Sequence, residues 1–236
     1  MRTCKYAAML SLAAILVLSA CGGESNPSSS NGDSGATKAV GSMTDSRDGQ
    51  TYKTVKIGTQ TWMAENLNFK TNGSSCYNND ESNCAKYGRL YTWAEAMSFV
   101  NLFDKDSSAY CVFYSDCTLP NAIYGVCPLG WHLPTQAEWD TLFFAVGNRS
   151  TAGAALKSSL GWNENGNGRD TFGFSALPAG NMLKDGFANE GYFASFWSST
   201  GEDRFAYGIY LFYDRDGADL DYYDQKNGFS VRCLKD

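Results

Sequence analysis

The chain begins with a short apolar run that ends at a cysteine, and this pattern decides which residues can take part in a fold. Arg2 and Lys5 precede the run, and the segment Leu18-Ser19-Ala20-Cys21 closes it. The run is too short for a membrane-spanning helix, and small residues lie directly before Cys21. The pattern predicts a signal peptide over residues 1–20, cleavage before Cys21, and acyl chains such as palmitate on that cysteine, which would anchor the protein in a membrane. An ordinary secretory leader followed by a chance cysteine is the alternative.

The residues after the cleavage point predict a tether followed by one domain. Ser, Asn, Gly and Thr dominate residues 21–45, a composition typical of flexible linkers. Residues 46–236 are long enough for a single domain with one hydrophobic core. Gly22 follows Cys21, where lipoproteins retained in an inner membrane often carry aspartate. We therefore expect a cell-envelope protein that is lipid-anchored in the outer membrane and exposed at the surface.

The charge balance argues against a nucleic-acid partner. The 19 basic residues less Arg2 and Lys5 leave 17, against 25 acidic residues. Phosphate binding needs clustered Lys and Arg, whereas acidic residues prevail here.

Six cysteines are left once Cys4 leaves with the signal peptide and Cys21 is acylated. An even number in an exported chain predicts disulfides, although sequence alone allows many pairings. Spacing favours two local bridges in polar loops, and these leave a third, long-range pair. The pairs are Cys76 with Cys84, Cys111 with Cys117, and Cys127 with Cys233. Because the local spacings are wide and the chain has one histidine, a zinc site is not expected.

Helix signals are clearest where capping boxes occur. Thr92 with Glu95 predicts a helix that runs to about residue 99, and Thr135 with Glu138 predicts one that ends at Gly147. A third helix is expected over residues 152–160. Alternating residues predict two strands joined by a turn over residues 51–64 and a hairpin with its turn at 216–217. Long Gly- and Asn-rich stretches separate these elements, so we expect a loop-rich α+β fold.

Ordered motifs along the chain resemble the Fibrobacter succinogenes major paralogous domain family. The resemblance extends from Asp48 to the end of the chain. The motifs are Asp48-Gly49-Gln50-Thr51-Tyr52, Thr61-Trp62-Met63-Ala64-Glu65-Asn66-Leu67, Gly88-Arg89-Leu90-Tyr91, Cys127-Pro128-Leu129-Gly130-Trp131-His132-Leu133-Pro134-Thr135, Phe172-Gly173-Phe174, Leu177-Pro178-Ala179-Gly180, Phe196-Trp197-Ser198-Ser199-Thr200 and Gly228-Phe229-Ser230-Val231-Arg232-Cys233. The family has no defined biochemical function.

A more distant similarity is to the C-type lectin-like fold of formylglycine-generating enzymes. Leu133-Pro134-Thr135, the following Glu138-Trp139 and the closing segment 228–233 carry it. This resemblance implies that the first and last strands pair and that a long-range disulfide, suited by Cys127 with Cys233, holds the loop-bearing half. It also implies an alternative function, oxidation chemistry at Cys233. Enzymes of that group place the working cysteine directly after Gly-Phe-Arg, whereas here two further residues intervene.

Other candidate chemistry has a simpler structural interpretation. His132 is the only histidine and lies in an apolar run, which is more typical of a structural residue than of a catalyst. The acidic residues of the last hairpin could hold a structural calcium ion, but their spacing does not follow an EF-hand loop. A solvated hairpin face is the preferred interpretation. These acidic residues are Asp214, Asp216, Asp219, Asp221 and Asp224. We assign no metal, cofactor or catalytic residue.

The loop over residues 162–170 is the stronger candidate for contact with a ligand. Its amides and carboxylates can pair with vicinal sugar hydroxyls, and exposed Trp or Tyr side chains can stack on a sugar ring. Loop formation alone would also explain its Asn and Gly content. The candidate ligand-binding residues are Trp162, Asn163, Glu164, Asn165, Asn167, Arg169, Asp170, Tyr213 and Tyr222.

Together these patterns favour a non-catalytic recognition domain displayed on the cell envelope. Polysaccharide is the expected ligand class, as in carbohydrate binding or adhesion, and a surface protein is the second. An oxidoreductase of the formylglycine-generating type acting through Cys233 is one alternative. A purely structural envelope protein is the other.

Overall fold

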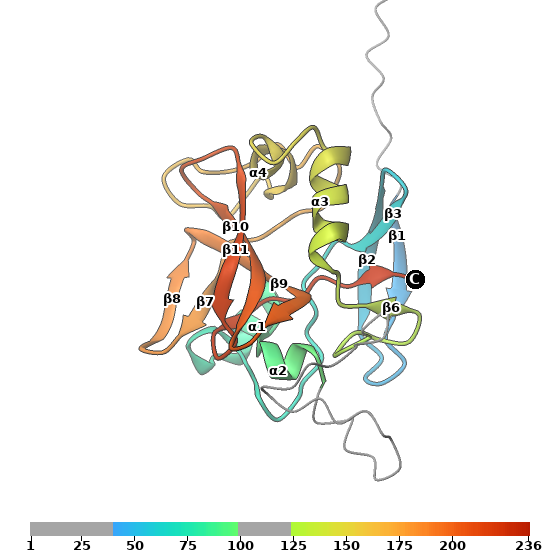
Figure 1. Cartoon of the computed structure of the whole chain (residues 1–236), viewed down its shortest axis with the longest axis vertical. Coiled ribbons are helices and arrows are strands. Elements are labelled where there is room, and N and C mark those ends of the chain that lie inside the picture. The colour runs from blue at the N-terminus through green and yellow to red at the C-terminus, as the bar shows by residue number, and fades with distance from the viewer. Residues whose placement is uncertain (1–39, 99–123) are drawn as a thin grey trace, which may run out of the picture. The chain divides into compact units, whose positions relative to one another are not determined.

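Two antiparallel-rich sheets organise the chain in the computed structural model, which describes residues 40–98 and 124–236. Within the described residues, the first sheet has five strands in the order β1-β2-β3-β13-β6. Its strands are β1 Val40–Thr44, β2 Thr51–Ile57, β3 Gln60–Met63, β13 Leu234–Lys235 and β6 Trp131–His132. The last strand pairs with β3 and β6, so the two ends of the described region share this sheet. Figure 1 shows β13 beside the blue strands.

The second sheet carries the last hairpin. Its order is β11-β10-β9-β7-β12-β5-β4, and β8 pairs with β7. Its strands are β4 Ser74–Ser75, β5 Leu90–Thr92, β7 Ala179–Leu183, β8 Gly186–Glu190, β9 Phe193–Glu202, β10 Phe205–Phe212, β11 Ala218–Asp224 and β12 Gly228–Phe229. One parallel contact joins β7 to β9. The predicted turn at residues 216–217 connects β10 to β11.

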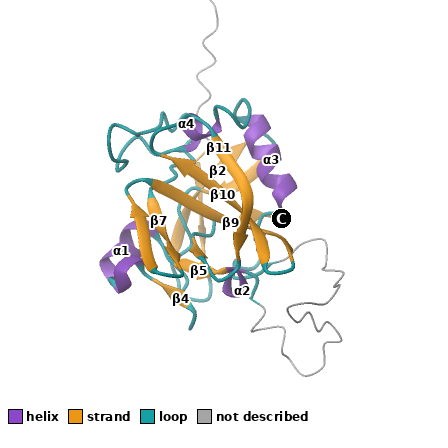
Figure 2. Ribbon diagram, turned by 60° about the vertical axis from the view of Figure 1, so that its left-hand side comes forward, coloured by secondary structure: helices purple, strands orange, loops and turns teal. Residues whose placement is uncertain are grey.

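Short helices lie around the outside of the strands in Figure 2. They are α1 Glu81–Tyr87, α2 Trp93–Ala96, α3 Gln136–Ala145 and α4 Ala152–Leu156, with a 3-10 turn at Tyr77–Asn79. Thr135 and Glu138 form the predicted capping box of α3. The described region is therefore a loop-rich α+β domain. None of its helices is long and apolar enough to span a membrane.

Aromatic side chains fill the space between the sheets and α3. Trp62 contacts Trp139 at 4.7 Å between ring centroids, and Trp197 stacks on Phe229 at 4.1 Å. Trp139 of α3 also contacts Phe196 of β9 at 5.6 Å, so its burial ties the helix to both sheets, whereas the Trp197–Phe229 pair joins two strands of the second sheet. Four tryptophans, Trp62, Trp93, Trp139 and Trp197, are buried in this core.

Two predicted disulfides are present in the described residues. Cys127 bonds to Cys233 across 106 positions, and Cys76 bonds to Cys84 across 8. The local bridge was expected in a polar loop, but Cys84 lies inside α1, a helix that no pattern in the sequence predicted. The predicted pair Cys111 and Cys117 lies outside the described residues, as do the predicted signal peptide, Cys21 and most of the predicted linker.

Several predicted boundaries were wrong. The linker was expected to reach residue 45, but Val40–Thr44 forms β1 in register with β2 and Asp45 is buried. The helix at Thr92 ends at Ala96 instead of about residue 99, because Ser98 adopts a positive φ of 51°. The helix at 152 ends at Leu156 instead of 160, because Lys157 turns extended and pairs with Ala176.

Candidate functional site

His132 is held between two carboxylates. Its Nδ1 lies 2.7 Å from Oδ1 of Asp236 and its Nε2 lies 3.0 Å from Oε1 of Glu138. Hydrogen bonds to these carboxylates, Glu138 above all, raise the pKa of His132 although burial opposes this. Both ring nitrogens are thus occupied by side chains that join β6, α3 and the end of the chain. Among the described residues, both ring nitrogens bind carboxylates and neither binds a hydroxyl or thiol, so the arrangement connects these three segments.

Cys233 has no free thiol in this structure. It is bonded to Cys127 and is fully buried. A disulfide sulfur cannot act as the thiolate that cysteine chemistry requires. The geometry at Cys233 therefore provides structure and no reactive group.

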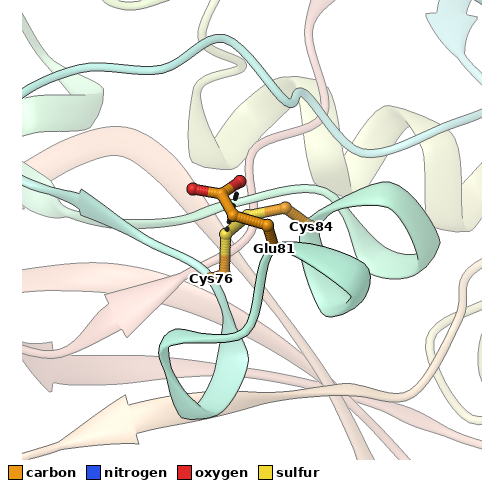
Figure 3. A group of neighbouring side chains, drawn as sticks. All are labelled: Cys76, Glu81 and Cys84. Carbon is orange, nitrogen blue, oxygen red and sulfur yellow. Dashed lines mark hydrogen bonds between the residues drawn. A yellow bond between two sulfur atoms is a disulfide. The ribbon is translucent and has the colours of Figure 1, made fainter.

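One group of three potential metal ligands occurs in the described residues, namely Cys76, Glu81 and Cys84. Figure 3 shows that the two sulfur atoms are joined to each other. The Glu81 carboxylate accepts two hydrogen bonds from Nη2 of Arg89 at 3.0 and 3.2 Å. Because the sulfurs are oxidised and the carboxylate is already paired with a cation, this group is not arranged as a metal site.

The predicted loop and the turn after β10 meet at one end of the domain, the top of Figure 1. Between them is a cavity of about 520 Å³, which we call the loop cavity. This volume falls in the usual range for small-ligand sites. The loop cavity is lined by Lys157, Glu164, Asn165, Gly166, Asn167, Tyr213, Asp214, Arg215 and Asp216. Four of these, Glu164, Asn165, Asn167 and Tyr213, belong to the predicted ligand-binding set.

Glycines let the loop approach the turn closely. A Cβ on Gly166 would lie 2.5 Å from the carbonyl oxygen of Tyr213, and one on Gly168 would lie 2.4 Å from that of Lys157. Only glycine allows backbone segments to pack at this distance. Gly166 therefore sets the width of the loop cavity beside Tyr213.

A buried lysine holds the turn in place. Lys157 is 3% exposed, and its Nζ donates to the carbonyl oxygens of Phe212, Tyr213 and Arg215 at 2.9, 3.3 and 3.2 Å. An ammonium has three donors, and all three are used here. Burial lowers the pKa of Lys157, and the negative charges of Asp216 and Asp214 partly oppose this effect. Nothing in the sequence marks Lys157, since its partners are backbone atoms of a segment more than fifty residues away.

The side chains at the mouth of the loop cavity are polar and aromatic. Glu164, Asn165 and Asn167 are exposed, and the first two adopt positive φ values of 51° and 61°. Tyr213 is half-buried and meets Tyr192 edge-on at 5.1 Å between ring centroids. The negative charge of Glu164 is the main cause that raises the pKa of Tyr213, which reflects their proximity. Asp214 and Asp216, predicted as part of a solvated hairpin face, also line the loop cavity.

Other members of the predicted set do not join this site. Trp162 is 5% exposed, and its Nε1 donates to Ser158 and to the carbonyl of Ala176, so it is a core residue and offers no stacking face. Tyr222 is 43% exposed but lies along β11, where its ring contacts Tyr207 at 4.0 Å. The remaining three, Asn163, Arg169 and Asp170, are not part of the lining of the loop cavity.

Asp170 lines a second cavity, of about 500 Å³, between β2 and α1. The charged side chains that reach it are engaged with each other or with the protein. Lys53 pairs with Glu65 at 3.9 Å, and the Asp170 carboxylate accepts two hydrogen bonds from Ser175 at 2.8 Å. Arg232 forms its floor and donates to Asn66 at 2.6 Å and to backbone carbonyls, while burial lowers its pKa to about 9. We therefore take the loop cavity as the candidate site.

Comparison with known families identifies the domain. The sequence model of the Fibrobacter succinogenes major domain matches residues 55–235. The chain belongs to the Fibrobacter succinogenes major domain family. No curated protein and no solved structure matches the chain significantly. The matched region of this Fibrobacter succinogenes major domain includes every residue of the loop cavity, whereas β1 precedes it.

Proposed function

We propose that this protein is a lipid-anchored protein of the cell envelope whose domain binds polysaccharide without transforming it. The convergence of Glu164, Asn165 and Asn167 with Tyr213 at the loop cavity carries the proposal. Amide and carboxylate groups can pair with neighbouring sugar hydroxyls, and a tyrosine ring can lie against the apolar face of a sugar. A C-type lectin-like fold is part of this proposal, supported by the long-range disulfide and by the sheet that holds both ends of the described region.

The side chains around the loop cavity support binding over catalysis. Hydrolysis of glycans commonly uses two carboxyl groups with separate acid and base roles. Here the Asp214 carboxylate is already paired with a cation, since its Oδ1 lies 3.5 Å from Nε of Arg215. A covalent route through a histidine-activated hydroxyl or thiol is not offered by this lining, which contains neither histidine nor cysteine among the described residues.

Glycan binding by the full chain in detergent tests this function. The chain is screened against neutral, aminated and acidic polysaccharides, and bound hexasaccharides are then titrated by calorimetry. Tyr213→Ala should weaken binding about fivefold to tenfold, which corresponds to about 1 to 1.4 kcal/mol for an aromatic contact. Tyr222→Ala is the matched control and should leave binding unchanged, because Tyr222 lies outside the loop cavity. No binding to any glycan would favour a purely structural envelope role.

Attachment to the membrane is tested separately. Labelling cells with a palmitate analogue should mark the protein, and Cys21→Ser should abolish the label and release the chain from the membrane fraction. Labelling that survives Cys21→Ser would contradict the lipid anchor at this residue.

A further inference from the structure

Some of the charged side chains around the loop cavity are paired within the protein, and others are not. Three carboxylates line it, those of Glu164, Asp214 and Asp216, and all three residues are exposed. Two cations line it as well, Lys157 and Arg215. What a ligand meets depends on which of these charges is already engaged within the protein.

Both cations are engaged. The three donors of Lys157 point into the turn, where they bind three carbonyl oxygens. Arg215 lies 3.5 Å from a carboxylate oxygen of Asp214 and 3.3 Å from one of Asp219. Neither cation is therefore directed at the ligand.

Two carboxylates at the loop cavity are left to interact with a ligand. Within the described residues, the side chains of Glu164 and Asp216 form no ion pair or hydrogen bond. The charge of Glu164 is the main cause that raises the pKa of Tyr213, so the two side chains lie close together at the cavity. A sugar stacked on the Tyr213 ring would thus bring its substituents beside a carboxylate that has no counter-ion. The side-chain oxygen of Asn165, also without a partner in the described residues, offers a further acceptor at the same mouth.

We propose that the loop cavity prefers amino sugars with a protonated amine over neutral sugars and rejects uronic acids. This inference rests on the proposed polysaccharide binding and names its ligand class. An ammonium group supplies three donors and a positive charge to the carboxylates of Glu164 and Asp216. A neutral hydroxyl supplies one donor and no charge. A uronate places a further negative charge beside Glu164, which has no ion-pair partner in the described residues, and beside Asp216, which Lys157 influences only through electrostatics.

Hexasaccharides with one backbone and different substituents test this preference. The β-1,4-linked hexamers of glucosamine, N-acetylglucosamine and glucose share their linkage and differ at one ring position, and a galacturonic acid hexamer adds the acidic case. The full chain in detergent is titrated with each at low salt. The glucosamine hexamer should bind about fivefold tighter than the glucose hexamer, the gain typical of an exposed charge pair. The gain should shrink in 0.5 M salt, to roughly twofold or less, and at alkaline pH where the amine is neutral.

Paired variants assign the preference to the cavity. Glu164→Gln should remove the advantage of the glucosamine hexamer and leave the glucose hexamer almost unaffected. Glu202→Gln makes the same change on an exposed glutamate outside the loop cavity and should keep the advantage. An equal loss in both variants would overturn the assignment to the cavity.

The outcomes separate this inference from the proposed function. Equal affinity for the glucosamine and glucose hexamers would overturn the amino-sugar preference while the polysaccharide function stands. No binding of any hexamer would refute both. A lysine hexapeptide that binds tighter than the glucosamine hexamer, with sensitivity to Glu164→Gln, would also overturn the proposal and assign the cavity to a basic protein segment.

Discussion

The two described disulfides close loops of very different length, and this difference predicts their separate contributions to stability. Cys127–Cys233 closes 106 positions and Cys76–Cys84 closes 8. In the chain-entropy model, these separations correspond to about 4.8 and about 2.5 kcal/mol of unfolding free energy. All four cysteines are almost fully buried, so replacing either pair by alanine removes similar apolar area. The loop-length difference, about 2.3 kcal/mol, should therefore dominate the comparison.

Urea unfolding of the full chain measures this difference. The double variant Cys127→Ala with Cys233→Ala should unfold at clearly lower urea than Cys76→Ala with Cys84→Ala, and both should unfold below the original chain. Because total stabilities are typically about 5–15 kcal/mol, the first variant is also measured with a stabilising osmolyte so that its transition stays observable. Equal destabilisation, or a greater loss from the local bridge, would refute the loop-length argument.

Three further predictions concern side chains described above. Two carboxylates raise the pKa of His132 above 6.5, so its stabilisation is complete below pH 6.5 and is lost as pH rises through the folded pKa. Thermal unfolding from pH 6 to 9 should show this loss, and His132→Asn should flatten it, since the chain has one histidine. Lys157→Met should lower the unfolding free energy by about 1–3 kcal/mol because three carbonyls lose their donor, whereas Lys157→Arg should recover part of it in urea unfolding. Gly166→Ala should weaken glycan binding by displacing Tyr213, whereas Gly217→Ala, whose nearest contact would be 3.4 Å, should bind normally in calorimetry. A thermal stability that does not change with pH would contradict the role of the His132 contacts. An unchanged unfolding free energy in Lys157→Met would contradict the role of its three hydrogen bonds, and equal glycan affinity of the two glycine variants would contradict the role of Gly166.

Local signals in the sequence were sufficient for part of the fold. Thr92 and Thr135 cap helices where predicted, Thr135 with the full capping box and Thr92 through its own side chain, because a cap depends on residues only three positions apart. The strands of the first hairpin and the last hairpin follow from alternation. By contrast, α1 was missed because its sequence, ESNCAKY, has no apolar stripe, and Asp80 as its cap was not recognised. Strand β1 was missed because pairing with β2, and not its own Gly- and Ser-containing sequence, defines it.

The candidate site was predictable in its residue types and not in its shape. Asn- and Glu-rich loops signal hydrogen-bonding capacity, which identified Glu164, Asn165 and Asn167. Trp162 was misassigned because a tryptophan at the start of a polar loop gives no sign of whether its ring turns inward. Here the backbone bonds of the loop to α4 turn it into the core, where Ser158 and a backbone carbonyl accept its indole N–H.

The position of the loop cavity follows from contacts that bridge distant segments. Lys157 at the end of α4 binds the turn after β10, while Gly166 and Gly168 let the intervening loop fold back against both. The same ammonium that fixes the turn is thereby withdrawn from the ligand, which leaves the carboxylates of Glu164 and Asp216 as the charges at the cavity mouth. A single buried lysine thus links the stability of the turn to the charge of the site. Replacing it with a neutral residue should both loosen the turn and make the cavity more negative, so structural and electrostatic effects on binding need the separate comparison with Glu164→Gln.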